Sequence, residues 1–288
     1  MFNHLSENKK IRPARFAGQF YSAEPGELRQ EIAGYLALAS ATKLAEPPKM
    51  ILVPHAGYMY SGPVAARAYN LLTGTDFTRV ILLGRSHNAS FAGVAADTHQ
   101  GWQTPLGKVL VDQKFILALA RADKDIFLDS APHQGDHILE AQLPFLQAVL
   151  SAKFQIAPLV LGSEETAFSH KLAQALAALI DKKTLVVISS DLAHYPPGRT
   201  AQALDQKTLA LIAGLDEPAL IAHLNGVGRL NIPNLQTLAC GGSAILTGMR
   251  LAQILKLKPK ILGYQNSGDR VPQGKDRVVG YGAVAFFT

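Results

Sequence analysis

Residues 50–69 read MILVPHAGYMYSGPVAARAY, an apolar segment, a histidine and a second segment with helical periodicity. Met50–Val53 is a short apolar run closed by Pro54, which is typical of a buried strand. Residues 61–63, Ser-Gly-Pro, begin the second segment, whose apolar spacing predicts a helix. His55 therefore occupies a strand-to-helix turn, where open α/β sheets place ligand-binding groups.

Two further apolar segments end in the same way. Residues 79–84 lead into His87, and residues 184–189 lead into Asp191 and His194. Because the carboxyl ends of parallel strands lie along one edge of a sheet, we expect these side chains to meet His55 there. A single histidine after a strand is usually a hydrogen-bonding loop residue, but the recurrence at three equivalent positions favours a shared site.

The rest of the chain alternates between helical and strand-like patterns. Asp136 is interpreted as the N-cap of a helix that Pro144 must kink or restart. This alternation predicts an α/β fold, with a mostly parallel or mixed central sheet covered by helices on both faces and an antiparallel edge from the last strands. With no repeat or linker, residues 1–288 are interpreted as one domain. Further helices are predicted at 22–38, 113–121, 138–150, 165–180, 200–213, 218–225 and 243–255, further strands at 93–96, 154–161, 260–265 and 279–287, and a loop at 102–107.

Composition excludes several classes of protein. The 288 residues are 48% hydrophobic and 17% charged, which is enough to bury a large core. The net charge is +6, but the basic residues are scattered, which argues against a nucleic-acid partner and leaves anionic small molecules compatible. No apolar run approaches the ~18 to 20 residues of a membrane span, and residues 1–16 lack a signal-peptide core. A single cysteine fits a reducing compartment, so we predict a cytoplasmic protein.

Cys240 adds a thiol to the candidate site. It lies just before the helix predicted at 243–255, where the helix dipole favours a thiolate. Two of the imidazoles and this thiolate would suit iron, copper or zinc, and a carboxylate in its place would give the two-His-one-carboxylate arrangement of non-haem iron oxygenases. His194, close to Asp191, could act as an acid/base group. Alternatively, Cys240 is a small buried apolar residue.

A second polar segment has two interpretations. His137 and Glu140 are three residues apart and could share a helix face toward the site. A helix cap and a solvated carboxylate would explain the same residues. The glycine-containing segments at 84–88, 101–108 and 226–231 lack the residues of a nucleophile elbow, a P-loop and a dinucleotide fingerprint, respectively. Serine hydrolysis and nucleotide-driven chemistry are therefore disfavoured.

Several ordered motifs together resemble the MEMO family, whose bacterial and archaeal members include protein B of the AmmeMemoRadiSam system. The resemblance implies a fold similar to the catalytic subunit of class III extradiol dioxygenases, which are non-haem iron enzymes that open catechol rings. It also implies a metal triad of His55, His87 and Cys240, with Asp191 and His194 nearby. The candidate catalytic residues are His194, Asp191 and His137. The motifs are Arg12-Pro13-Ala14, Ala17-Gly18, Phe20-Tyr21, residues 54–58 (PHAGY), Tyr60-Ser61-Gly62, Leu83-Gly84, Ser86-His87, His137, residues 139–140 and 142–145, residues 189–192 (SSDL), His194-Tyr195 and Cys240-Gly241.

Three functions are open at this point. The first is a redox-active metal enzyme of dioxygenase ancestry acting on a small molecule, with iron as the first candidate and copper or zinc as alternatives; Cys240 then stands where the dioxygenases have a glutamate. The second is a hydrolase or transferase in which Cys240 is the nucleophile and the Gly241 and Gly242 amides stabilise an oxyanion. The third is a non-catalytic binding or signalling module, as eukaryotic relatives are regarded. Bacterial relatives are often encoded beside a radical SAM protein, which suggests a shared pathway.

Overall fold

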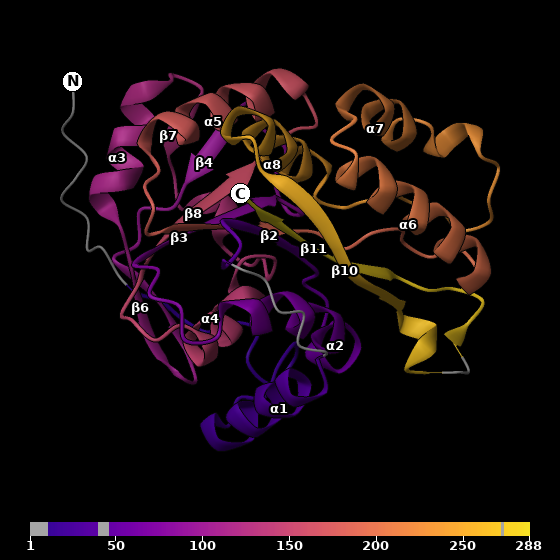
Figure 1. The fold of residues 1–288 in the computed structure, drawn as a ribbon, viewed down its shortest axis with the longest axis horizontal. Coiled ribbons are helices and arrows are strands. Elements are labelled where there is room, and N and C mark those ends of the chain that lie inside the picture. The colour runs from indigo at the N-terminus through magenta and orange to yellow at the C-terminus, as the bar shows by residue number, and fades with distance from the viewer. Residues whose placement is uncertain (1–10, 40–45, 272–273) are drawn as a thin grey trace.

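The computed structural model describes residues 11–39, 46–271 and 274–288, so most of the segment interpreted as lacking a signal peptide lies outside the described residues. The described part forms one mixed sheet with helices on both faces (Figure 1). The predicted α/β class is confirmed. The strands are β1 (Ile11–Arg12), β2 (Met50–Val53), β3 (Arg79–Arg85), β4 (Val94–Ala96), β5 (Gly101–Thr104), β6 (Gly107–Val111), β7 (Ile126–Leu128), β8 (Gln155–Leu161), β9 (Thr184–Ser189), β10 (Lys258–Asn266) and β11 (Gly280–Phe287).

Four parallel strands form the centre of the sheet in the order β8, β3, β9, β2. Their central residues are buried, as expected for parallel strands covered on both faces. In the register of the sheet, Val53 at the end of β2 pairs with Ser189 at the end of β9. The carboxyl ends of β2, β9 and β3 therefore lie side by side, and the residues that follow these strands emerge at one edge.

The eight α-helices of the described residues cover both faces of the sheet. The helices α3, α5 and α8 pack together on one face, where α8 contacts β3 and β9 and α7 contacts α8, whereas α1, α2 and α4 contact one another on the other face (Figure 1). The helix α6 lies against β10 and β11. The bounds are α1 (Pro25–Leu38), α2 (Tyr58–Tyr69), α3 (Gln113–Ala122), α4 (Leu143–Val149), α5 (Thr166–Leu179), α6 (Gly198–Ala213), α7 (Glu217–Leu224) and α8 (Gly242–Leu255).

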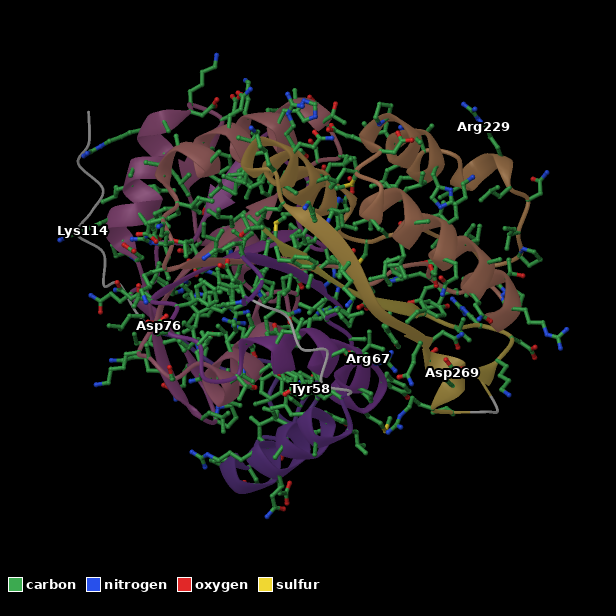
Figure 2. All side chains as sticks on the ribbon, in the orientation of Figure 1. Tyr58, Arg67, Asp76, Lys114, Arg229 and Asp269 are labelled. Carbon is green, nitrogen blue, oxygen red and sulfur yellow. The ribbon has the colours of Figure 1, made fainter. Side chains whose placement is uncertain are left out.

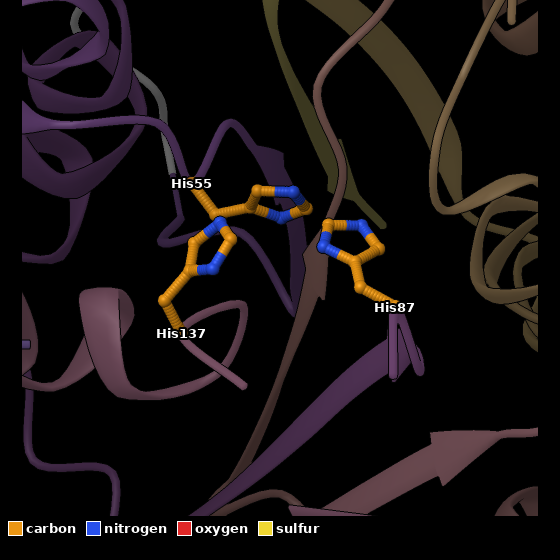
Figure 3. Close-up of side chains that lie close together, drawn as sticks. All are labelled: His55, His87 and His137. Atoms are coloured by element: carbon orange, nitrogen blue, oxygen red, sulfur yellow. The ribbon is translucent and has the colours of Figure 1, made fainter. Parts of the chain in front are cut away.

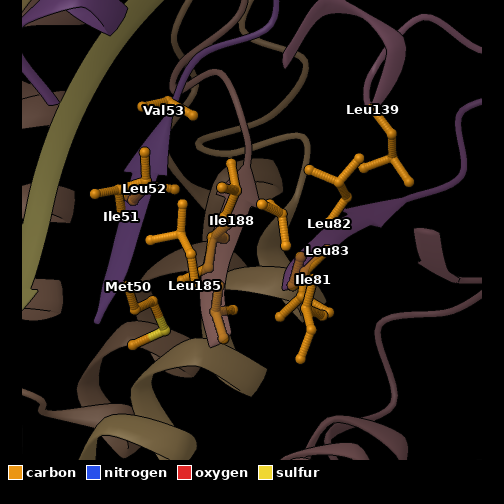
Figure 4. Packing of buried hydrophobic residues seen from close by; sticks show 14 of the residues in the cluster. Met50, Ile51, Leu52, Val53, Ile81, Leu82, Leu83, Leu139, Leu185 and Ile188 are labelled. Carbon is orange, nitrogen blue, oxygen red and sulfur yellow. The ribbon is translucent and has the colours of Figure 1, made fainter. Parts of the chain in front are cut away.

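The apolar residues of the central strands form the core beneath the site. Figure 4 shows side chains of β2 beside those of β9 and β3, with Leu139 near the carboxyl end of β3. Met50, Ile81 and Ile188 are at most 1% exposed. Complete burial of such a side chain stabilises the folded state by about 1.5 to 3 kcal/mol relative to leaving it exposed. The strands that carry the site residues are therefore anchored in a well-packed core.

The structure differs from the sequence predictions at two segments near the ends of the sheet. Residues 102–107 form a β5–β6 hairpin instead of a loop, because Trp102 is buried and Thr104 pairs with Gly107 across a two-residue turn. The helix α2 begins at Tyr58, three residues before the predicted start, where the Tyr58 N–H donates to the Phe20 carbonyl at 2.7 Å. The predicted antiparallel edge is confirmed by the pairing of β11 with β2 and β10.

The segment predicted as a single helix at 138–150 is divided. A 3-10 turn, η3 (Glu140–Gln142), precedes α4, and Pro144 lies in the first turn of α4. The predicted restart at Pro144 is therefore confirmed, because proline is tolerated where a helix has no N–H partner to lose. The N-cap role of Asp136 was wrong: its carboxylate accepts from the N–H of His87 at 2.8 Å and from the N–H of Ile138 at 3.3 Å.

Charged side chains lie mainly at the periphery of the molecule, as Asp76, Lys114 and Arg229 illustrate in Figure 2. Among the described residues, no helix combines the length and apolar character needed to cross a membrane.

Candidate metal centre

Three histidines converge at the carboxyl edge of the sheet. His55 follows β2, His87 follows β3, and His137 comes from the loop before η3. One ring nitrogen from each lies within 4.8 Å of the other two (Figure 3). The sequence predicted that His55 and His87 would meet, and the structure adds His137 to them.

The spacing of these nitrogens fits a single transition-metal ion. Two imidazole nitrogens bound to one ion at about 2.1 Å are at most about 4.2 Å apart. Small rotations of the side chains therefore suffice to bring the three nitrogens into one coordination sphere. Three neutral imidazoles with further positions open suit zinc, copper or iron.

All six candidate side chains predicted from the sequence line one cleft of about 550 Å³: His55, His87, His137, Asp191, His194 and Cys240. Phe20, Tyr60 and Arg85 form part of its wall. The structure thus brings the predicted residues together, while their individual roles as ligands or acid/base groups stay predictions.

His55 is held from two sides. Its backbone N–H donates to Asp191 Oδ1 at 2.8 Å, and its Nδ1 lies 2.9 Å from Ser189 Oγ. Only 2% of the residue is exposed, and burial is the main cause that lowers its pKa well below the ordinary value, with charge repulsion from His87 adding to it. The imidazole is therefore neutral at neutral pH, which is the form that binds metals.

His137 and His87 are oriented by different means. The His137 ring stacks on Phe20 with centroids 4.1 Å apart, and burial followed by repulsion from His55 lowers its pKa to about 3. His87 is the most exposed of the three; the Asp136 carboxylate accepts from its backbone N–H at 2.8 Å and lies 3.8 Å from its ring Nδ1. One wall of the cluster is therefore aromatic and the other is open to solvent.

Cys240 lies against His55 and precedes α8. Its Sγ is 3.2 Å from His55 Nε2 and accepts from the Asp191 N–H at 3.3 Å. The expected preference for a thiolate does not hold in the metal-free chain: burial, and then the Asp191 carboxylate, raise the pKa of the thiol above its ordinary value. A nearby cation would act in the opposite direction and favour the thiolate.

Backbone hydrogen bonds fix the segment that carries His194. The His194 N–H donates to the Thr237 carbonyl at 3.0 Å, and the Tyr195 N–H donates to the Val278 carbonyl at 2.6 Å. Tyr195 has a φ of 72°, in the left-handed region that non-glycine residues rarely adopt. Within the described part of the chain, the buried His194 Nε2 has no hydrogen-bond partner. Because His194 lines the cleft, its Nε2 is available to accept a proton from a bound molecule or to donate one to it.

Asp205 supports the same segment from α6. Its Oδ1 accepts from the Ala193 N–H at 2.8 Å and its Oδ2 accepts from Tyr264 at 2.9 Å, and burial raises its pKa to about 7. The carboxyl of Asp205 therefore stays protonated in the folded protein at pH values above ~4, where it is ionised in the unfolded chain. The stability that this bound proton contributes is complete below pH ~4 and is lost as the pH rises through about 7.

Asp205→Asn is expected to remove this pH dependence: its Oδ1 still accepts from the Ala193 N–H, and its Nδ2 donates to Tyr264 Oη where the carboxyl oxygen accepted. Between pH 5 and 7 the free energy of unfolding of the wild type should fall relative to that of the variant by up to about 1.4 kcal/mol per pH unit. Urea unfolding of both proteins at several pH values measures this difference. Parallel curves for the two proteins would show that Asp205 does not titrate in this range.

The structure corrects the interpretation of Glu140 and shows the supporting role of residues that the sequence named only as family motifs. Glu140 is fully buried rather than solvated and forms an ion pair with Arg12. It also accepts from Tyr21 Oη at 2.7 Å and from the Phe16 N–H at 2.8 Å, which fixes the segment that carries Phe20 to His137. Local periodicity could not reveal this role, because Arg12 lies 128 residues away along the chain.

Comparison with known proteins places the chain in a family. The Memo-like protein family matches residues 12–285. A MEMO1 family protein of Sulfolobus acidocaldarius is 37% identical over 96% of this chain and 99% of its own length, and one of Methanopyrus kandleri is 34% identical over 96% and 98%. Among solved structures, an uncharacterized protein of Escherichia coli K12 aligns with a TM-score of 0.48 and 14% identity over 81% of this chain and 98% of its own. By the family match and these full-length relatives, the chain belongs to the MEMO family.

Proposed function

We propose that this protein is a metal-dependent, redox-active enzyme of dioxygenase ancestry that acts on a small molecule in the cytoplasm. His55 and His87 hold the ion, and Cys240 or His137 supplies the third ligand. The observation that carries the proposal is the convergence of three imidazoles within 4.8 Å in a cleft of about 550 Å³. Iron is the first candidate, with copper and zinc as alternatives.

The other cleft residues fit roles around a bound substrate. A metal ion would supply Lewis-acid chemistry and, for iron or copper, redox chemistry. His194 is neutral, because burial lowers its pKa, and its Nε2 is unpaired among the described residues, so it is the residue that would take or give a proton. Asp191 acts through His55, because its carboxylate accepts from the His55 backbone N–H.

Metal analysis of protein purified without a His-tag, under aerobic and anaerobic conditions, tests the proposal. We expect about one transition-metal ion per chain, retained on gel filtration. A chain that binds no iron, copper or zinc at micromolar concentrations would overturn the proposal and favour the non-catalytic binding module.

A Cys240 nucleophile is the second candidate function, favoured by the 3.2 Å contact between Cys240 Sγ and His55 Nε2. Two observations weigh against it. Burial raises the pKa of the thiol, and the Gly241 N–H already donates to Ser190 Oγ at 2.9 Å, which takes this amide away from an oxyanion.

Thiol alkylation near neutral pH separates the two candidates. A catalytic nucleophile is a reactive thiolate, so Cys240 should be alkylated quickly whether or not a chelator is present. For a buried or metal-bound Cys240 we expect slow alkylation, at least about tenfold slower than that of a free thiol at the same pH. Mass spectrometry of the single cysteine gives the rate, and fast alkylation of the metal-loaded protein would favour the nucleophile.

A further inference from the structure

Behind His55 runs a chain of buried polar side chains that leads away from the cleft. Tyr69 Oη donates to Gln142 Oε1 at 2.7 Å, and Gln142 Nε2 donates to Ser189 Oγ at 2.9 Å. Ser189 Oγ in turn lies 2.9 Å from His55 Nδ1. All four residues are at most 2% exposed, so water does not complete these hydrogen bonds.

The orientation of the Gln142 amide follows from its neighbours. Its Nε2 lies 3.0 Å from the Pro54 carbonyl, which only accepts, and its Oε1 receives the Tyr69 hydroxyl. The reverse orientation would bring two acceptors together at Pro54. The Gln142 amide nitrogen therefore donates both to Ser189 Oγ and to the carbonyl of Pro54, the residue before His55.

The direction of the Ser189 hydroxyl follows in the same way. The Ile138 carbonyl lies 2.6 Å from Ser189 Oγ and can only accept, so it takes the single hydroxyl proton. Gln142 fills one of the two lone pairs of Ser189 Oγ. The remaining lone pair faces His55 Nδ1, which must bear a proton to bond with it.

We propose that Ser189, oriented by Gln142 and Ile138, is a positioning residue that fixes His55 as the Nδ1–H tautomer and so leaves Nε2 without a proton, facing the cleft and Cys240 Sγ. The inference rests on the proposed metal-binding function and extends it to residues outside the ligand set. Metal-binding histidines generally donate their second ring N–H to such a partner, which sets both the tautomer and the ring angle.

The variant Ser189→Ala removes the acceptor and leaves the His55 Nδ1–H buried without a partner. We expect metal affinity to fall by about 10- to 100-fold, the usual effect of losing such a partner. Ser169→Ala is the matched control: Ser169 lies on α5, is equally buried and donates to the Ser243 carbonyl of α8 at 2.9 Å, without contact to His55. Its affinity should stay within about twofold of the wild type, the additivity error for an independent site.

Two measurements make the test decisive. Nitrogen-15 NMR of the metal-free protein reads the His55 tautomer, expected to be Nδ1–H in the wild type and Ser169→Ala and mixed in Ser189→Ala. Chelator competition reads metal affinity. An Nε2–H tautomer in the wild type, or equal affinities for the two variants, would overturn the inference. An Nδ1–H tautomer in a protein that binds no metal would support the tautomer assignment and overturn the proposed function instead.

Discussion

His55→Ala is expected to abolish stoichiometric metal binding. His55 is the buried member of the three-histidine cluster, its Nε2 faces the cleft, and it also contacts Cys240 Sγ at 3.2 Å. Changes outside the ligand shell already weaken metal sites by about 10- to 100-fold, so loss of a direct ligand should exceed about 100-fold. Metal quantification after gel filtration, followed by chelator competition, measures the loss.

Two further variants identify the third ligand. Cys240→Ser and His137→Ala each remove one candidate, and the variant that loses as much affinity as His55→Ala marks the ligand. Equal losses in both would indicate a four-ligand site of three imidazoles and one thiolate. His194→Ala is the matched control, a cleft histidine outside the cluster, and should retain its metal. Full metal content in His55→Ala would remove the cluster from the proposed function.

The part of the site that could be predicted is the part that the sheet itself positions. His55 and His87 follow apolar strands, and the parallel register of β2, β9 and β3 brings their carboxyl ends together. Such strands are recognisable from local patterns, so the convergence of the residues that follow them can be deduced before any contact is known.

The supporting residues could not be predicted because their roles depend on distant contacts. Gln142 reads as an ordinary residue of a helical segment, yet its partners are Tyr69, Ser189 and the Pro54 carbonyl. Glu140 lies in the same segment and points into the protein toward Arg12, because the turn η3 divides the predicted helix and changes which face each residue occupies. The 3.6-residue periodicity of an unbroken helix therefore does not predict which side chains of this segment face the core.

Glu140→Gln is expected to destabilise the protein by about 3 to 5 kcal/mol, because it leaves the Arg12 guanidinium buried without a counter-ion. The side chains of Arg12 and Glu140 are 1% and 0% exposed, so solvent cannot screen the charge. The new amide nitrogen would also face the guanidinium donors or the donors Phe16 N–H and Tyr21 Oη. Urea unfolding measures the loss, and Asp76→Asn, which breaks the exposed pair with Lys183, should leave the midpoint unchanged.

A double variant separates the charge from the packing. If the unpaired guanidinium causes the loss, Arg12→Met combined with Glu140→Gln should recover part of the stability of the single variant, although the carbonyls of Asp136 and His133 lose their Arg12 donors. A double variant that is less stable than Glu140→Gln alone would instead assign the loss to those hydrogen bonds. Because Glu140 also fixes the segment that places Phe20 on His137, the single variant should weaken metal binding only if His137 is a ligand.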